Sequence, residues 1–237
     1  VSIAAASLPT VSRHAAHEDL KGMRETISRA LRLMLMLNVP ATIGLIALGH
    51  PIVQLIFERG SFSSIDTVST TAALLFYAPG LVGYSAVRIA VPAFYALGNS
   101  LLPAYISMAT VVLNIALNLV LVTLIGYQGL ALGTSVAALA NALVLLIVLN
   151  RRLEGLNTKQ IVTTGVKITI ASLVMGAAAT LTHSWLLLSW VSDNVLTRFG
   201  SITISIGVGL IVLVLTSRLL RLTELDQAWQ QLRSKLG

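Results

Sequence analysis

Neutral polar side chains recur on one face of two long uncharged segments in the middle of the chain. In the second segment, Thr134, Ser135 and Asn141 stand among glycine and alanine residues. In the first, four residues at i, i+3, i+7 and i+11 share one side of a helix with 3.6 residues per turn: Ser107, Thr110, Asn114 and Asn118. Hydroxyl and amide oxygens at this spacing could line a polar or ion site, or bond one helix to the next. The residues by themselves leave both interpretations open.

Arg88 is the only charged residue well inside any of the long apolar segments. A charge in such a place marks a contact to an anionic substrate group or to a carboxylate partner. Arg88 precedes Leu97, the predicted end of its helix, by nine residues, or about 13 Å at 1.5 Å per residue. The aliphatic stem of an arginine covers part of that depth, so the guanidinium could instead reach the nearer membrane surface. Both interpretations stay open.

These polar residues must be positioned by helices that cross a membrane. The chain is 56% hydrophobic and 11% charged, against about 25% charged in soluble domains. Crossing a hydrocarbon core of roughly 30 Å takes about 20 residues. The sequence therefore predicts an all-α, polytopic transmembrane helix bundle with six full spans, at residues 33–57, 67–97, 104–125, 128–150, 165–190 and 201–219. Residues 1–8 are predicted to be the tail of a preceding helix that ends at Pro9.

The third and fourth spans are predicted to form a hairpin around the turn at residues 126–129. An antiparallel hairpin sets Asn118 near the depth of Thr134, and Asn114 near the depth of Asn141. An amide without a partner in lipid costs roughly 2–7 kcal/mol. We therefore expect these amides to face protein or a wet cavity.

Two amphipathic segments flank the spans. Residues 19–32 are predicted to lie in the membrane interface with an apolar side toward lipid, and residues 223–237 to form an amphipathic tail helix. If the spans alternate in direction, all Lys and Arg residues except Arg59, Arg88 and Arg198 fall on one side. The positive-inside rule makes that side cytoplasmic, so the C-terminus is expected to be cytoplasmic as well.

Several classes of function are disfavoured by composition. The chain has no cysteine, its four histidines are far apart, and nearly all of its nine acidic residues lie in loops. A metal site and a carboxylate pair for acid–base catalysis are therefore not expected. A glycine-rich phosphate loop is absent from the sequence as well. We expect neither an enzyme nor a bound cofactor, and the basic residues are expected to meet membrane lipids rather than nucleic acid.

Short motifs along residues 1–152 resemble the MurJ/MviN family of lipid II flippases, in the order and spacing of that family. Two of them are fairly specific: the Phe-Glu-Arg-Gly turn at residues 57–60 and the segment Pro92-Ala93-Phe94-Tyr95-Ala96-Leu97. Others are Leu8-Pro9-Thr10-Val11-Ser12-Arg13, Tyr84-Ser85-Ala86-Val87-Arg88 and Gly129-Leu130-Ala131-Leu132-Gly133-Thr134-Ser135. Beyond residue 152 the resemblance rests on hydropathy and position.

The family belongs to the multidrug/oligosaccharidyl-lipid/polysaccharide exporter superfamily, and its members have fourteen spans. The resemblance implies a C-terminal lobe at residues 1–152 (from the end of span eight to span twelve), two extra spans at 153–222, and the tail at 223–237. It implies transport of lipid-linked peptidoglycan precursor across the bacterial inner membrane by alternating access. The N-terminal lobe, with the cavity arginines that hold the substrate's pyrophosphate, would be a missing partner of this chain.

The resemblance also suggests sites. Positions that bind sodium in some members match Asn114, Asn118, the carbonyl of Leu130, and Thr134. Asn118 departs from the pattern, because sodium-binding members have an acidic residue there. Coupling to Na⁺ or H⁺ is therefore expected to involve neutral oxygens from this hairpin. Arg88 is expected to contact phosphate or the inner gate.

Two rival functions fit the same residues. One is export of another polyprenyl-linked saccharide, or of drugs, by a member of the same superfamily. The other, of a different class, is a non-transporting membrane scaffold for cell-wall enzymes.

Overall fold

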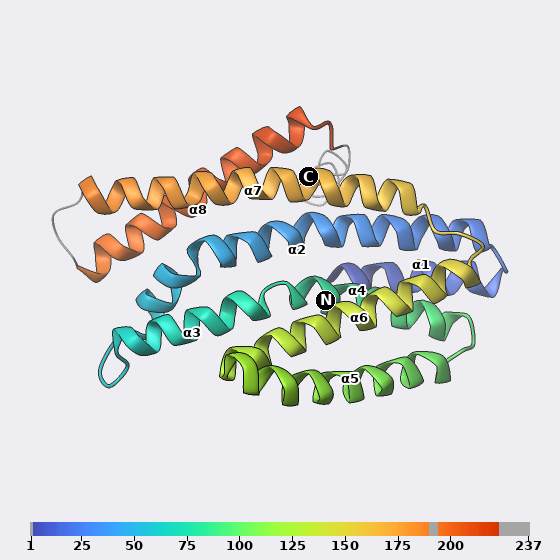
Figure 1. Ribbon diagram of the computed structural model, residues 1–237. Coiled ribbons are helices and arrows are strands. Elements are labelled where there is room, and N and C mark those ends of the chain that lie inside the picture. Colours follow the sequence, from blue (N-terminus) through green and yellow to red (C-terminus); the bar gives the residue numbers. More distant parts are fainter. Residues whose placement is uncertain (1, 190–193, 223–237) are drawn as a thin grey trace. The chain divides into compact units, whose positions relative to one another are not determined.

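A computed structural model describes residues 2–189 and 194–222, and these fold entirely into helices and their connections. The helices are α1 (Ser2–Ala16), α2 (Leu20–Phe57), α3 (Ser64–Tyr77), α4 (Gly80–Ala96), α5 (Leu101–Ile125), α6 (Tyr127–Arg152), α7 (Thr158–Ser189) and α8 (Val195–Leu219) (Figure 1). The predicted tail helix at 223–237 and Trp190, the predicted end of the fifth span, lie outside the described residues.

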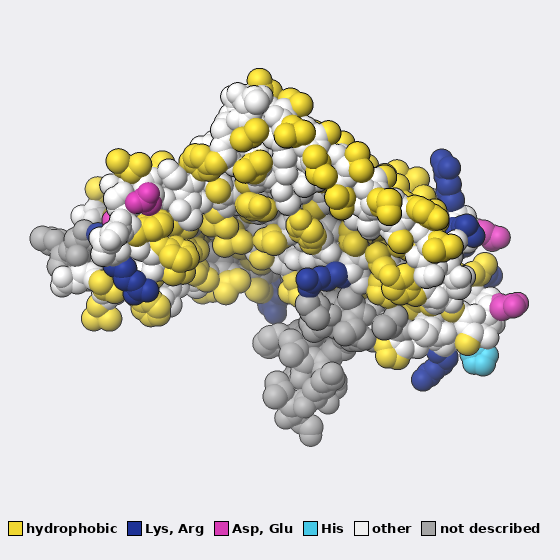
Figure 2. Space-filling model, turned by 90° about the horizontal axis from the view of Figure 1, so that it is seen from below, with side chains coloured by type: hydrophobic (Ala, Val, Ile, Leu, Met, Phe, Trp, Pro, Cys, Tyr) yellow, Lys and Arg dark blue, Asp and Glu magenta, His cyan; other side chains and the backbone are white. Residues whose placement is uncertain are grey.

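Six stretches of helix in the described residues are long and apolar enough to cross a membrane. They are α2, the stretch Ser64–Ala96 that contains α3 and α4, and then α5, α6, α7 and α8. The predicted all-α bundle with six spans is therefore confirmed. Hydrophobic side chains cover much of the face seen in Figure 2, as expected for helices whose outer surface meets lipid.

The chain divides into two compact units. Unit 1 contains Val1–Asn38 and Ala72–Thr163, and unit 2 contains Val39–Thr71 and Thr164–Gly237. The divisions fall inside α2, α3 and α7, so each of these helices contributes residues to both units.

The core of unit 1 is built from apolar side chains of α1, α2, α4 and α6. Phe94 of α4 is the largest of its fully buried side chains. Around it pack Met23, Ile27 and Leu31 of α2 and Leu145 and Leu149 of α6. Burying a side chain of this size contributes roughly 1.5–3 kcal/mol, so this cluster is the main source of cohesion in unit 1.

The structure corrects the prediction for residues 19–32. They form the first part of the continuous helix α2, and their apolar stripe packs in the core of unit 1 instead of facing lipid. Met23, Ile27 and Leu31 are at most 2% exposed. An apolar stripe at helical spacing looks the same in the sequence whether lipid or protein covers it, which is why the sequence did not separate the two.

The polar side of the same helical stretch holds the connection between α6 and α7. Arg24 donates to the carbonyls of Leu153 (2.7 Å from Nη2) and Glu154 (3.1 Å). One turn on, the hydroxyl of Ser28 accepts from the backbone amide of Asn157 (3.3 Å). The start of α2 is therefore a structural clamp within unit 1, in addition to leading into a span.

The predicted helix end at Pro9 is also wrong, because α1 continues through Pro9 to Ala16. A proline inside a helix costs about 3 kcal/mol through its missing N–H and its ring. Helix α1 packs on α4, and Val11, just after the proline, is buried in the core of unit 1. Tertiary burial of this kind offsets the local preference.

Small residues set the spacing of the helices on both sides of α6. A Cβ added at Gly129 would overlap the backbone of Leu121 on α5, and one added at Gly133 would overlap the side chain of Asn118. On the other side, a Cβ at Gly83 of α4 would lie 2.7 Å from the carbonyl of Ala138. Helix α6 is therefore in close backbone contact with both α5 and α4, as small residues allow in membrane helices.

In unit 2, α7 packs with α8 and with the second half of α2 through small residues. A Cβ at Gly176 would lie 3.0 Å from Ile43 of α2, and a Cβ at Gly209 of α8 would lie 3.4 Å from Ala179 and Met175 of α7. The ammonium of Lys167 on α7 donates to the carbonyl of Leu220 at the end of α8 (2.9 Å). This unit is thus held by close apolar packing, with a polar bond at one end.

Candidate polar site between α5 and α6

Helix α5 is apolar on its outer side and polar on the side toward α6. Val112, Ile115 and Leu119 are 54–67% exposed, whereas the polar stripe predicted from the sequence is half-buried: Ser107, Thr110, Asn114 and Asn118. In Figure 1 the two helices run side by side as an antiparallel hairpin. The expectation that the amides face protein is confirmed for Asn114 and Asn118.

The four residues predicted for an ion site are joined in one chain of hydrogen bonds. The side-chain amide of Asn118 donates to Asn114 Oδ1 (3.2 Å), and that of Asn114 donates across to Thr134 Oγ1 (3.5 Å). The Thr134 hydroxyl in turn donates to the carbonyl of Leu130 (2.7 Å). Residues on two helices, up to 20 positions apart in the chain, therefore form one polar cluster, which we call the hairpin site.

The register of the hairpin differs in part from the predicted one. Asn118 lies against Gly133, one residue from the predicted Thr134. Asn114, however, bonds to Thr134 instead of meeting Asn141, which lies seven residues, or about 10 Å, farther along α6. The close contact of Gly129 with Leu121 fixes this register. The predicted register was obtained by counting residues from the turn. Such a count does not include how the side chains of α5 and α6 pack against each other.

Two buried acceptors in this hairpin lack a hydrogen-bond partner among the described residues: Asn118 Oδ1 and Asn141 Oδ1. A buried polar atom left unpaired costs about 1–3 kcal/mol. Asn118 Oδ1 belongs to the hairpin site, next to the backbone of Gly133. It is an available ligand oxygen at the end of the hydrogen-bonded chain.

The hairpin site fits a monovalent cation better than a transition metal. It offers two amide oxygens, a hydroxyl and a backbone carbonyl, the oxygen ligands that hard cations prefer. A bound cation would take the place of the amide protons that now point at Asn114 Oδ1 and Thr134 Oγ1. In residues 2–189 and 194–222, groups of three or more His, Cys, Asp or Glu side chains that could hold a metal ion are absent.

Arg88 is not part of the hairpin site. Its side chain is exposed on α4, and among the described residues it has no hydrogen-bond or ion-pair partner. The position is eight residues before Ala96, the end of α4, or about 12 Å along the helix. The structure thus leaves this guanidinium free to meet a group outside the described residues.

Ser135 was noted in the sequence but given no role, and the structure shows that it has a distinctive one. Its hydroxyl donates to the carbonyls of Phe76 (2.5 Å) and Tyr77 (3.1 Å), where α3 ends. The signal that could have identified it is Pro79-Gly80, which predicts a break and free carbonyls in the second span. The sequence did not indicate which hydroxyl would reach them.

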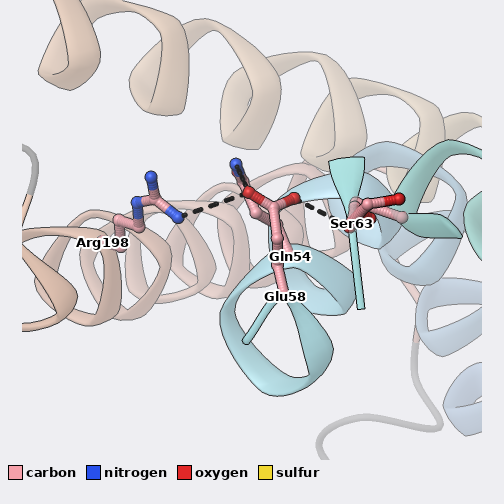
Figure 3. Close-up of polar contacts among 5 residues, drawn as sticks. Gln54, Glu58, Ser63 and Arg198 are labelled. Atoms are coloured by element: carbon pink, nitrogen blue, oxygen red, sulfur yellow. Dashed lines mark hydrogen bonds and ion pairs between the residues drawn. The ribbon is translucent and has the colours of Figure 1, made fainter. Parts of the chain in front are cut away.

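A second polar cluster lies in unit 2, at the Phe-Glu-Arg-Gly turn between α2 and α3. The carboxylate of Glu58 accepts from Thr67 Oγ1 (2.8 Å) and Gln54 Nε2 (3.2 Å), and Arg198 Nη1 of α8 lies 3.9 Å from Glu58 Oε1. Figure 3 shows Arg198 directed at this carboxylate. These donors, above all the Thr67 hydroxyl, hold the pKa of Glu58 below its usual value.

Comparison with known proteins gives a consistent result. The sequence model of the family described as "Lipid II flippase MurJ" matches residues 1–199. A "Probable lipid II flippase MurJ" of Vibrio cholerae serotype O1 is 30% identical over 235 residues, which is 96% of this chain and 44% of the relative. One of Rickettsia prowazekii is 37% identical over 134 residues, which is 56% of this chain and 26% of the relative.

A solved structure described as "Lipid II flippase MurJ, inward closed conformation" matches with a TM-score of 0.65 and 26% identity. The match covers 90% of this chain and 42% of that structure. The chain thus spans less than half the length of these relatives.

Proposed function

Because the chain belongs to the MurJ family of lipid II flippases, we propose that it acts as the C-terminal part of a fourteen-span flippase. That protein would move lipid II, the lipid-linked peptidoglycan precursor, across the bacterial inner membrane by alternating access. Such transport makes and breaks no covalent bond in the substrate. The observation that carries the proposal is the match of residues 1–199 to the family.

Within that protein we assign residues 1–152 to the C-terminal lobe and residues 153–222 to two extra spans. The C-terminus is assigned to the cytoplasm, because nearly all Lys and Arg residues fall on one side of alternating spans. The N-terminal lobe of the flippase and the surrounding lipids are the expected partners.

We assign the hairpin site to a Na⁺ ion that couples transport to the ion gradient. The support is that Asn114, Asn118, Leu130 and Thr134 are joined by hydrogen bonds and that Asn118 Oδ1 is a buried acceptor lacking a partner in the described part of the chain. Amides and hydroxyls do not titrate near neutral pH. Of the two coupling ions expected from the sequence, Na⁺ is therefore favoured over H⁺ at this site.

An ion held between α5 and α6 can favour one arrangement of the two helices over another. A ligand shifts such an equilibrium only by its difference in affinity for the two states. Na⁺ would compete here with the hydrogen bonds that Asn114 Oδ1, Thr134 Oγ1 and the carbonyl of Leu130 accept, so its affinity would differ between arrangements of α5 and α6 that keep these bonds and arrangements that break them. The lack of a formal negative charge among these ligands makes binding weak and therefore readily reversible.

We assign Arg88 to a contact with a phosphate of the lipid-linked substrate or with the inner gate. An unpaired guanidinium about 12 Å inside a span is costly unless it meets an anion or water. The diphosphate of the substrate supplies such an anion, and Arg recognises phosphate through two parallel hydrogen bonds.

The test uses the complete protein as the sole flippase of a cell whose own flippase has been depleted. Asn114→Ala and Thr134→Val should lower the amount of lipid II that reaches the outer face, and should weaken ²²Na⁺ binding to the purified protein. Thr123→Val is the matched control, since Thr123 is exposed and, among the described residues, bonds only to Val120 of its own helix. Normal flipping and normal Na⁺ binding in all three variants would leave the hairpin site with a packing role only. Failure of the unaltered protein to flip lipid II, despite correct insertion, would favour the scaffold.

A further inference from the structure

We propose that Ser135 is a positioning residue that couples the hairpin site to the break between α3 and α4. This inference rests on the proposed function, because it assumes that the hairpin site binds Na⁺. In this proposal, Ser135 transmits the effect of Na⁺ binding at the hairpin site to α4, the helix that carries Arg88.

The break has its own hydrogen-bond pattern. Helix α3 ends at Tyr77, α4 begins at Gly80, and Pro79 between them has no N–H to donate. The first amides after the break bond only three residues back, from Leu81 to Ala78 (3.1 Å) and from Val82 to Pro79 (3.3 Å). This pattern leaves the carbonyls of Phe76 and Tyr77 to the hydroxyl of Ser135, which donates to both.

Ser135 is fitted closely into this place. It is 2% exposed, and a Cβ added at Gly80 would lie 2.7 Å from its Oγ and 3.0 Å from its Cα. A hydroxyl in such surroundings has no access to water as an alternative partner. A lateral shift of α6 therefore must either carry the end of α3 with it or break the bonds from Ser135.

The neighbouring residue on α6 belongs to the hairpin site. Thr134 accepts from Asn114 of α5, while Ser135 donates to α3. Consecutive residues on a helix point about 100° apart, because a turn has 3.6 residues. One turn of α6 thus connects the polar site on one side to the helix break on the other, with no flexible segment between them.

Two other buried serines, Ser172 and Ser205, do not have this arrangement. The hydroxyl of Ser172 donates to the carbonyl of Ile168 (2.6 Å), and that of Ser205 donates to Ser201 (2.7 Å), each four residues back in its own helix. Such bonds join nothing beyond the helix itself. The Ser135 hydroxyl reaches residues 58 and 59 positions away in the chain, and Ser172→Ala is therefore a matched control for Ser135→Ala.

The experiment measures hydrogen–deuterium exchange of the Leu81 and Val82 amides in the purified complete protein, with Na⁺ or with choline. Binding of ²²Na⁺ is measured on the same samples. We expect Na⁺ to change the exchange rate by about fivefold or more in the unaltered protein and in Ser172→Ala, a typical size for coupling between sites. In Ser135→Ala, Na⁺ should bind with an affinity within about twofold of the unaltered protein and leave the exchange rate unchanged.

Gly80→Ala provides a second variant, because its added Cβ would push the break away from Ser135. It should likewise bind Na⁺ normally and lose the response at the break. A Na⁺ response that persists in Ser135→Ala would overturn the inference. So would Na⁺ binding to the unaltered protein without any change at the break, in which case the proposed ion site would stand. Absence of Na⁺ binding to the unaltered protein would overturn the ion site and this inference together.

Discussion

Asn114 on α5 donates a hydrogen bond from its side-chain amide to the hydroxyl of Thr134 on α6, with 3.5 Å between Nδ2 and Oγ1. This bond joins two helices whose outer sides are almost wholly aliphatic. A pair of polar groups at this depth of a membrane protein is held only where the groups satisfy each other or bind a third. The Asn114–Thr134 bond is therefore the natural place to test whether the hairpin site is packing alone or a binding site.

Replacing Thr134 by Val keeps the shape of the side chain and removes the hydroxyl. The Asn114 amide then loses its acceptor on α6, and interhelical hydrogen bonds of this kind contribute about 0.6–2 kcal/mol. We expect the free energy of unfolding to fall by about that amount, measured by denaturant titration in detergent. Thr123→Val, on the exposed side of α5, should lower the free energy of unfolding by less than Thr134→Val does. Equal losses in the two variants would contradict a specific role for the Asn114–Thr134 bond.

Asn118→Asp places a carboxylate where the buried amide oxygen now has no partner among the described residues. A formal charge at about 4 Å from Na⁺ is worth up to about 4 kcal/mol at an effective dielectric constant of 20, before the cost of desolvation. We expect Na⁺ to bind at least about tenfold more tightly, a change of about 1.4 kcal/mol, by isothermal titration calorimetry. Asn141→Asp, seven residues beyond Thr134 on α6, should increase the affinity for Na⁺ by less than Asn118→Asp does. A larger effect at Asn141 would move the ion site along the hairpin.

Gly133→Ala should disrupt the hairpin site through its shape. The added Cβ would overlap the Asn118 side chain, and relieving such an overlap typically costs about 1–3 kcal/mol. We expect lower thermal stability and weaker Na⁺ binding. Gly207→Ala in α8 is the control, because no other described residue comes within 4 Å of its added Cβ and alanine favours a helix by about 1 kcal/mol over glycine. If Gly133→Ala were as harmless as this control, the close packing at Asn118 would be refuted.

The Glu58 cluster predicts a defined dependence of stability on pH. The pKa of Glu58 is lowered from 4.5 chiefly by the Thr67 hydrogen bond, then by Gln54, with a contribution from Arg198. A carboxyl with a lowered pKa in the folded state stabilises that state fully above 4.5. This stabilisation is lost as the pH falls through the lowered value.

We therefore expect Glu58→Gln to lose less stability between pH 6 and pH 3 than the unaltered protein loses. The measurement is the midpoint of thermal unfolding in detergent across that range. For each protein, the midpoint at pH 3 is compared with the midpoint of the same protein at pH 6. Glu25→Gln, an exposed position, is the control and should follow the unaltered protein. An identical pH profile for Glu58→Gln would show that the cluster does not stabilise the fold.

Much of this protein was determined by its sequence alone. Six apolar runs of about 20 residues can satisfy their backbone groups in a membrane only as helices, so the all-α bundle followed from length and composition. The inward direction of Asn114 and Asn118 followed from the cost of an unpaired amide in lipid. The helix before the Gly126 turn also ended at Ile125 as predicted, and α6 began at Tyr127, one residue before the predicted start.

The tertiary structure decided which partners these elements have. The apolar stripe of Met23, Ile27 and Leu31 faces the core of unit 1, and Pro9 lies within a helix, because burial against α4 and α6 outweighs the local signal. Close contact at Gly129 placed Asn114 beside Thr134 and not beside Asn141. The bond from Ser135 to Phe76 joins residues 59 positions apart, and no periodic pattern encodes such a contact. Local patterns specify which face of a helix is polar or apolar, whereas the choice of neighbour depends on how all the faces fit together.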